Sequence, residues 1–167
     1  MGLSLDGIYG FHDFSIHFSY PKKIVNSIID AEHLKGRERF RYKKAVILMG
    51  ANATGKTSLG RALLHIFEYI ASGIPSPLCE MVSAKKGNFC IDFVNGDYRL
   101  QRLSGEIDPA CNDVVIQYYT TEIGPMDSYE KCIGKLEDHT KEAIRSASSL
   151  KRLIGSFQYR FAYPEIE

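Results

Sequence analysis

The chain has 167 residues, 44% of them hydrophobic and 25% charged, which is the composition of one ordinary globular domain and excludes a disordered or collagen-like chain. The 21 Lys and Arg nearly balance the 20 Asp and Glu, so a net charge of +1 does not by itself support binding to nucleic acid or to a membrane. No apolar run approaches the roughly 18 residues of a membrane helix, and the N-terminus lacks the pattern of a secretion signal.

The first predicted element is a strand over residues 14–18, in which every second residue is Phe or Ile. A basic stretch follows over residues 21–44, with eight Lys and Arg against three Asp and Glu. Within it, residues 24–34 have the pattern of a short helix. The basic stretch has two interpretations, a nucleic-acid contact or a solvated surface, and the neutral charge of the whole chain favours the second.

A buried strand, a loop and a helix are predicted next. Residues 45–49, Ala-Val-Ile-Leu-Met, form a continuous apolar run, which is typical of a strand buried on both faces, as in a parallel sheet. Residues 50–55 then form a loop. From Lys56 the apolar residues recur at helical spacing on one stripe, so residues 56–72 are predicted as an amphipathic helix. Gly73 and two following prolines end that helix.

Antiparallel strands are predicted over residues 88–120. Two alternating runs flank Asn95-Gly96, a pair that favours a hairpin because both positions of a tight hairpin turn need a positive φ. Residues 114–119 have the pattern of a further strand. The tail over residues 128–167 is predicted to be partly helical up to residue 156, with a last strand at residues 157–161.

The most informative segment is Gly50–Thr57, which matches the G-x-x-x-x-G-K-[ST] phosphate-loop motif completely. Its glycines let the backbone N–H groups point inward, and the positive end of the following helix adds to a site for a polyanion. Lys56 is expected to contact the β- and γ-phosphates, and the Thr57 hydroxyl to bind Mg²⁺. The alternative is a tight strand-to-helix turn with an incidental lysine. The predicted nucleotide-binding residues are Gly50, Ala51, Asn52, Ala53, Thr54, Gly55, Lys56, Thr57 and Ser58.

The opening residues 7–18 together with residues 46–63 resemble the start of an ABC-class ATPase head, most closely the SMC, RecF and OLD-type ATPases. Loops in these families often have asparagine at the position of Asn52. The resemblance implies an α/β fold, a P-loop NTPase-like lobe with a parallel loop strand and an adjoining antiparallel sheet. It also implies ATP and Mg²⁺ as ligands, and a C-terminal lobe, a partner subunit or a head-to-head dimer that completes the site.

The resemblance also implies an acidic metal ligand, a serine-glycine signature and a metal-sensing glutamine. Asp92 follows apolar residues, but its place in the hairpin favours a solvent-facing strand residue. Residues 103–106, Leu-Ser-Gly-Glu, lack the second glycine of the signature and are interpreted as a strand end and turn. Gln117 is a candidate for the glutamine beside the metal, although a solvent-facing strand residue is the simpler interpretation. No catalytic residue is assigned.

Three functions therefore remain open. The first is an ATP-binding lobe, either the N-terminal part of a longer ATPase or a truncated relative, which hydrolyses ATP only with a missing downstream half or a partner. The second is a small P-loop kinase that transfers the γ-phosphoryl group of ATP. A parallel sheet with an arginine-bearing lid over the loop would support this function. The third is a non-catalytic interaction module that keeps the loop.

Cysteine and histidine spacing points to neither a disulfide frame nor a metal site. The cysteines are far apart and form no C-x-x-C pair, and the five histidines show no H-x-x-H or H-E-x-x-H spacing. Scattered single thiols are typical of a reducing compartment, so a cytoplasmic location is expected. The four cysteines are Cys79, Cys90, Cys111 and Cys132.

Overall fold

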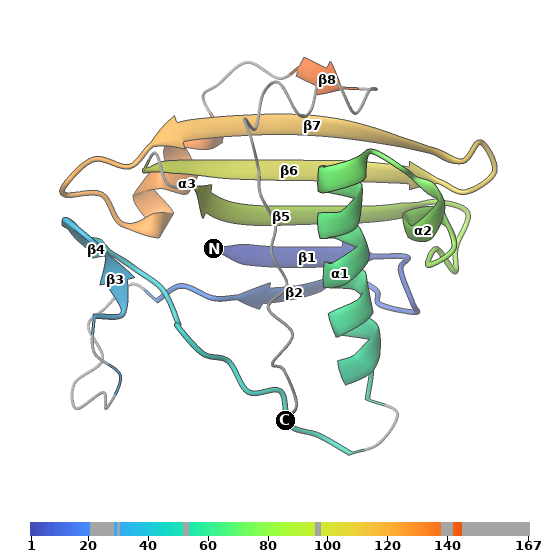
Figure 1. The fold of residues 1–167 in the computed structure, drawn as a ribbon, viewed down its shortest axis with the longest axis horizontal. Coiled ribbons are helices and arrows are strands. Elements are labelled where there is room, and N and C mark those ends of the chain that lie inside the picture. Colours follow the sequence, from blue (N-terminus) through green and yellow to red (C-terminus); the bar gives the residue numbers. More distant parts are fainter. Residues whose placement is uncertain (21–28, 30, 52–53, 96–97, 138–141, 145–167) are drawn as a thin grey trace, which may run out of the picture.

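A computed structural model gives the chain a six-stranded antiparallel sheet with a long helix, α1, on one face and a shorter helix, α3, on the other (Figure 1). The strand order is β2-β1-β5-β6-β7-β8. The sheet strands are β1 (Gly2–Asp6), β2 (Phe14–His17), β5 (Gly87–Asn95), β6 (Arg99–Asp108), β7 (Asp113–Glu122) and β8 (Glu142–Ile144). The structure describes residues 1–20, 29, 31–51, 54–95, 98–137 and 142–144.

The remaining elements of the described residues are a two-stranded sheet and three helices. The small sheet pairs β3 with β4 in an antiparallel arrangement. These elements are β3 (His33–Leu34), β4 (Arg37–Arg41), α1 (Lys56–Ser72), α2 (Ser76–Cys79) and α3 (Tyr129–Glu137).

The predicted fold class, a P-loop NTPase-like lobe with a parallel loop strand, is wrong. Every strand pair in the described residues is antiparallel. Residues 45–49, the predicted loop strand, have no regular secondary structure, and the side chains of Ile47 and Met49 are 82% and 88% exposed. A strand is held by hydrogen bonds to its neighbours, and no strand of the described residues pairs with this run. Its apolar composition alone therefore does not make it a strand.

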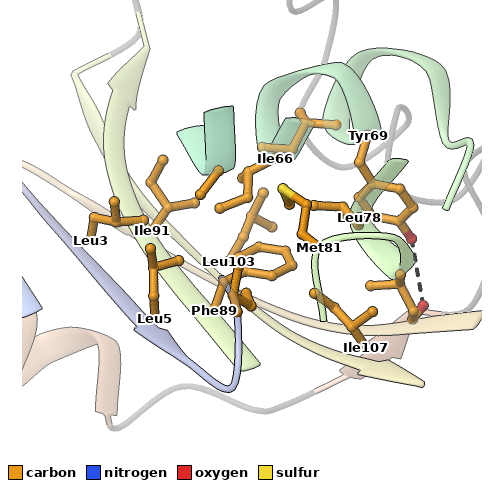
Figure 2. Close-up of a cluster of buried hydrophobic side chains, with 14 of the residues drawn as sticks. Leu3, Leu5, Ile66, Tyr69, Leu78, Met81, Phe89, Ile91, Leu103 and Ile107 are labelled. Carbon is orange, nitrogen blue, oxygen red and sulfur yellow. Dashed lines mark hydrogen bonds between the residues drawn. The ribbon is translucent and has the colours of Figure 1, made fainter. Parts of the chain in front are cut away.

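The main core lies between one face of the sheet and α1. Alternate residues of the central strands face it, among them Leu5 of β1, Ile91 of β5 and Leu103 of β6. Figure 2 shows these side chains in one cluster with Ile66 and Tyr69 of α1. The Tyr69 hydroxyl also donates a 3.5 Å hydrogen bond to the backbone oxygen of Val114. Strand β1 is not among the predicted strands. Its Leu3 and Leu5 alternate with polar residues and contribute to this core.

A second, smaller core lies on the opposite face, under α3 and β4. Its fully buried members include Phe40 of β4, Leu100 of β6 and Leu136 of α3. The rings of Phe40 and Tyr129 meet edge to face with centroids 6.2 Å apart. This core covers only one end of the face, and no helix of the described residues covers the other end of the same strands.

Several predicted elements are confirmed. Residues 14–17 form β2, and α1 buries the predicted stripe with Leu59, Ala62, Ile66 and Ile70. Gly73 ends α1 in a left-handed conformation with φ 75°, and its N–H bonds to the Tyr69 oxygen. The predicted strand at residues 114–119 is part of β7, which is longer at both ends.

The hairpin is confirmed but its turn differs from the prediction. Asn95 pairs with Arg99 across the strands, so it is the last strand residue rather than a turn residue, and Tyr98 carries a positive φ of 54°. Residues 103–106 lie in the middle of β6, not at a strand end and turn, because β6 continues to Asp108. In the tail, α3 and β8 occur, and the predicted last strand at residues 157–161 lies outside the described residues. Most of the predicted helix at residues 24–34 also lies outside them, and its last two residues form β3.

Candidate functional site

The phosphate-loop motif lies at the start of α1. Gly55 precedes the helix in a left-handed conformation with φ 84° and ψ 5°, and its backbone oxygen accepts the Leu59 N–H at 2.8 Å. No side chain caps the first turn, and that turn carries no acidic residue. The first N–H groups of a helix have no partner within the helix, so this end of α1 has the electrostatics of an anion site.

Lys56 folds back over the loop instead of extending into solvent. Its Nζ donates to the backbone oxygens of Gly50 at 2.8 Å and Ala51 at 2.6 Å, and to Oγ1 of Thr54 at 3.1 Å. The Thr54 hydroxyl in turn donates to the Ala51 oxygen at 2.9 Å. The ammonium group thus has three oxygen partners, all from the loop.

The remaining motif residues have simpler surroundings. Thr57 is exposed on the first turn of α1, so its hydroxyl faces solvent, and Ser58 beside it is half-buried. Asn52 and Ala53, both predicted to bind nucleotide, lie outside the described residues.

A second segment, the β1–β2 turn at residues 7–13, borders the loop. Phe11 from this turn lies against Gly55, because a Cβ placed on Gly55 would be only 3.3 Å from Cζ of the Phe11 ring. Phe11 also packs on Phe14, with ring centroids 4.8 Å apart. The turn is held by a 2.8 Å hydrogen bond from the Gly7 N–H to the Phe11 oxygen. No sequence pattern indicates Phe11 as a site residue, because the contact joins two segments that are far apart along the chain.

The other predicted candidates lie away from the loop. Gln117 projects from the sheet face opposite α1, since its neighbour Ile116 belongs to the α1 core, and its Oε1 accepts a 3.1 Å hydrogen bond from the Tyr119 hydroxyl. The structure therefore does not bring Gln117 together with Thr57. Ser104 and Glu106, the polar side chains of the Leu-Ser-Gly-Glu segment, project from this same face.

Asp92 is a buried ion-pair residue, not the solvent-facing residue that was predicted. Its carboxylate is bound in a bidentate fashion by Arg102, with 2.7 Å from Nε and 3.0 Å from Nη2, and it accepts a 2.5 Å hydrogen bond from the Tyr129 hydroxyl. Burial and the neighbouring Asp92 carboxylate raise the pKa of Tyr129, and Asp92 raises the pKa of Arg102. These three groups satisfy one another, so Asp92 joins α3 to the sheet rather than binding a metal.

The described residues contain no group of three or more His, Cys, Asp and Glu side chains arranged to hold a metal ion. Among them, no helix has the length and apolar character required to cross a membrane. Comparison of the chain with protein-family models, curated proteins and solved structures gave no match.

Proposed function

We propose that the chain binds Mg²⁺-ATP through residues 50–58 and acts as the ATP-binding lobe of an ABC-class ATPase. The observation that carries this proposal is a complete G-x-x-x-x-G-K-T motif that opens a 17-residue helix whose first turn has no side-chain cap. The left-handed Gly55 provides the turn that the motif requires at this position.

Binding would exchange the partners of Lys56. The oxygens of Gly50 and Ala51 now hold its ammonium group, and phosphate oxygens would replace them with charge-assisted bonds. The N–H groups of the first turn of α1 would donate to the same phosphates. The exposed Thr57 hydroxyl would bind Mg²⁺, which neutralises the charge of the polyphosphate.

Hydrolysis would need residues from elsewhere, because a water-orienting group has to lie near the γ-phosphate. The two candidates in the described residues are unsuitable: Asp92 is bound to Arg102 and Tyr129, and Gln117 lies on the opposite face of the sheet. A C-terminal lobe, a partner subunit or a head-to-head dimer would supply the missing groups.

A small P-loop kinase is the second candidate, and the lack of a parallel strand pair in the described residues counts against it, as it counts against the parallel loop strand expected of the ABC-class lobe. Such a kinase was expected to show a parallel sheet around the loop, and every described strand pair is antiparallel. A non-catalytic interaction module that keeps the loop would share its geometry and would show no turnover even with a partner.

Calorimetric titration of the full chain with ATP tests the proposal. We expect ATP to bind in the presence of Mg²⁺ and to bind at least tenfold more weakly without it. Lys56→Ala should weaken binding at least tenfold, while Lys85→Ala, which removes an exposed lysine with no ion pair in the described residues, should leave binding within twofold. Failure of the wild-type chain to bind at millimolar ATP would contradict the proposal, and γ-phosphoryl transfer to an acceptor by the isolated chain would favour the kinase.

A further inference from the structure

The sheet face opposite α1 carries an open trough at the end that α3 leaves uncovered. Its floor is a row of directly paired residues on five adjacent strands: Ser15, Ser4, Cys90, Ser104 and Gln117. Four of these side chains are short, which hollows the surface, and the cavity measures about 550 Å³. Five strands spaced about 4.8 Å apart make the row about 19 Å long. We call this cavity the sheet trough.

A second row of paired residues forms one side of the sheet trough and makes it acidic. It runs through Asp6, Asn88, Glu106 and Val115 on four adjacent strands, and Asp13 joins it from the β1–β2 turn. The trough is therefore elongated across the strands, with a polar floor and carboxylates along one side.

The charges of the sheet trough favour a cation. Glu106 is paired with Lys86, so that lysine is already neutralised. Asp6 accepts the Asp13 N–H at 3.2 Å and lies 3.9 Å from Nδ1 of His12, while the Asp13 carboxylate has no cationic partner among the described residues. An anion would meet two carboxylates whose charge no Lys or Arg in the described part of the chain offsets.

The hydrogen-bonding groups of the floor are available to a ligand. Within the described part of the chain, the side chains of Ser4, Ser15 and Asn88 make no hydrogen bond. Hydroxyl and amide oxygens next to carboxylates suit a ligand with several N–H donors. The ring of Phe89 packs into the α1 core on the other face, so stacking of a planar ring on it is excluded.

We propose that the sheet trough binds a linear polyamine, whose ammonium groups would meet Asp6, Asp13 and the floor hydroxyls while its methylene segments lie over the short floor residues. The length of the row suits a chain of several amines better than a single cation. A peptide suits the trough less, because β1, β5, β6 and β7 are already paired on both sides and offer no edge for its backbone.

Calorimetric titration of the full, nucleotide-free chain at low salt tests this inference; ATP is omitted because polyamines bind its phosphates. Spermine should bind at least tenfold more tightly than the shorter putrescine. The double variant Asp6→Asn with Asp13→Asn should weaken spermine binding at least tenfold. Asn88→Arg, an exposed change that places a cation in the trough, should do the same. Glu80→Gln, an exposed carboxylate outside the trough, should stay within twofold.

Other outcomes would overturn the inference. The first is the absence of detectable spermine binding at millimolar spermine, and the second is equal spermine affinity of Asn88→Arg and the wild-type chain. The third is complete displacement of spermine by Mg²⁺ at matched ionic strength, which would indicate unspecific charge screening. Tighter binding of a tetralysine peptide than of spermine would overturn the choice of ligand. Ser104→Leu, which fills the floor, provides a second steric test, and thermal unfolding confirms that each variant is folded. None of these results depends on the phosphate loop.

Discussion

Gly55 begins α1 from a left-handed conformation that most other residues avoid, and the ring of Phe11 closes the space beside it. Gly55→Val would introduce both a strained φ and a contact with this ring, since a β-branched side chain resists a positive φ. We expect this variant to lose at least tenfold in ATP affinity in the same titration that tests Lys56→Ala.

Gly60 offers the matched control for Gly55. It lies within α1, and a Cβ placed on it would meet nothing within 4 Å. Gly60→Ala should therefore leave ATP affinity unchanged and stabilise the chain by up to about 1 kcal/mol, because alanine restricts the unfolded chain and favours a helix. Equal ATP affinity of Gly55→Val and Gly60→Ala would show that the loop does not need the left-handed turn.

Asp92 links α3 to the sheet, because its carboxylate binds Arg102 of β6 and the Tyr129 hydroxyl of α3. Asp92→Asn would leave the partly buried Arg102 without its anion, so unfolding in urea should show a loss of about 3 to 5 kcal/mol. Tyr129→Phe removes only the hydrogen bond to the carboxylate and should cost about 1.5 to 3 kcal/mol. Glu130→Gln, an exposed change on the same helix, should stay within about 0.5 kcal/mol. A loss for Asp92→Asn no larger than that of Glu130→Gln would contradict this assignment.

At the scale of elements, α3 is fixed at its start by Asp127. This buried carboxylate bonds to Lys131 at 2.8 Å, to Lys135 at 2.5 Å and to the Gly124 N–H at 2.8 Å. Bonds to the two lysines hold the pKa of Asp127 well below its usual range, against the opposing effect of burial. The bonds thus join the loop before α3 to the helix that follows.

The depressed pKa of Asp127 predicts an acid-sensitive contribution to stability. A carboxylate with a lower pKa in the folded state stabilises it fully above its unfolded-state pKa of about 4, and this stabilisation is lost as the pH falls below that value. Urea unfolding between pH 7 and pH 3 should therefore show a larger loss for the wild-type chain than for Asp127→Asn, and the two curves should converge toward low pH. Parallel curves would show that the contacts of Asp127 do not stabilise the fold.

Elements with a local pattern were predictable from the sequence, and elements that depend on distant partners were not. The stripe of α1 and the alternation of β5, β6 and β7 follow from spacing within each segment. The burial of Asp92 depends on Arg102 and Tyr129, which the sequence alone does not place beside it. In the candidate site, the motif predicted Lys56 at the helix start, while the contact of Phe11 with Gly55 required the folded chain.

At the scale of the whole molecule, the sheet separates two surfaces with different chemistry. One face carries α1 and the phosphate-loop motif, and the other carries the sheet trough. The β1–β2 turn contributes to both, because Phe11 borders the loop and Asp13 lines the trough. The parallel sheet expected from the apolar run at residues 45–49 did not occur, since a run of this kind indicates burial but does not identify the partner that buries it.

The exposed apolar run at residues 45–49 leads to a prediction about self-association of the whole molecule. Ile47 and Met49 project almost fully into solvent beside the phosphate loop, and exposed apolar side chains in a segment without regular secondary structure promote association. Replacing both by lysine should change the free energy of unfolding by no more than about 0.5 kcal/mol. It should also reduce binding of a hydrophobic dye and self-association in sedimentation velocity.

Ile66→Ala provides the comparison for this double variant. Ile66 is fully buried in the α1 core, so its truncation should cost about 2 to 5 kcal/mol. If the double lysine variant lost as much stability as Ile66→Ala, residues 45–49 would be packed against the rest of the chain in solution. The exposed conformation of this run would then be wrong, and with it the path by which the chain enters the phosphate loop. A small loss together with reduced association would instead establish the run as an uncovered apolar surface beside that loop.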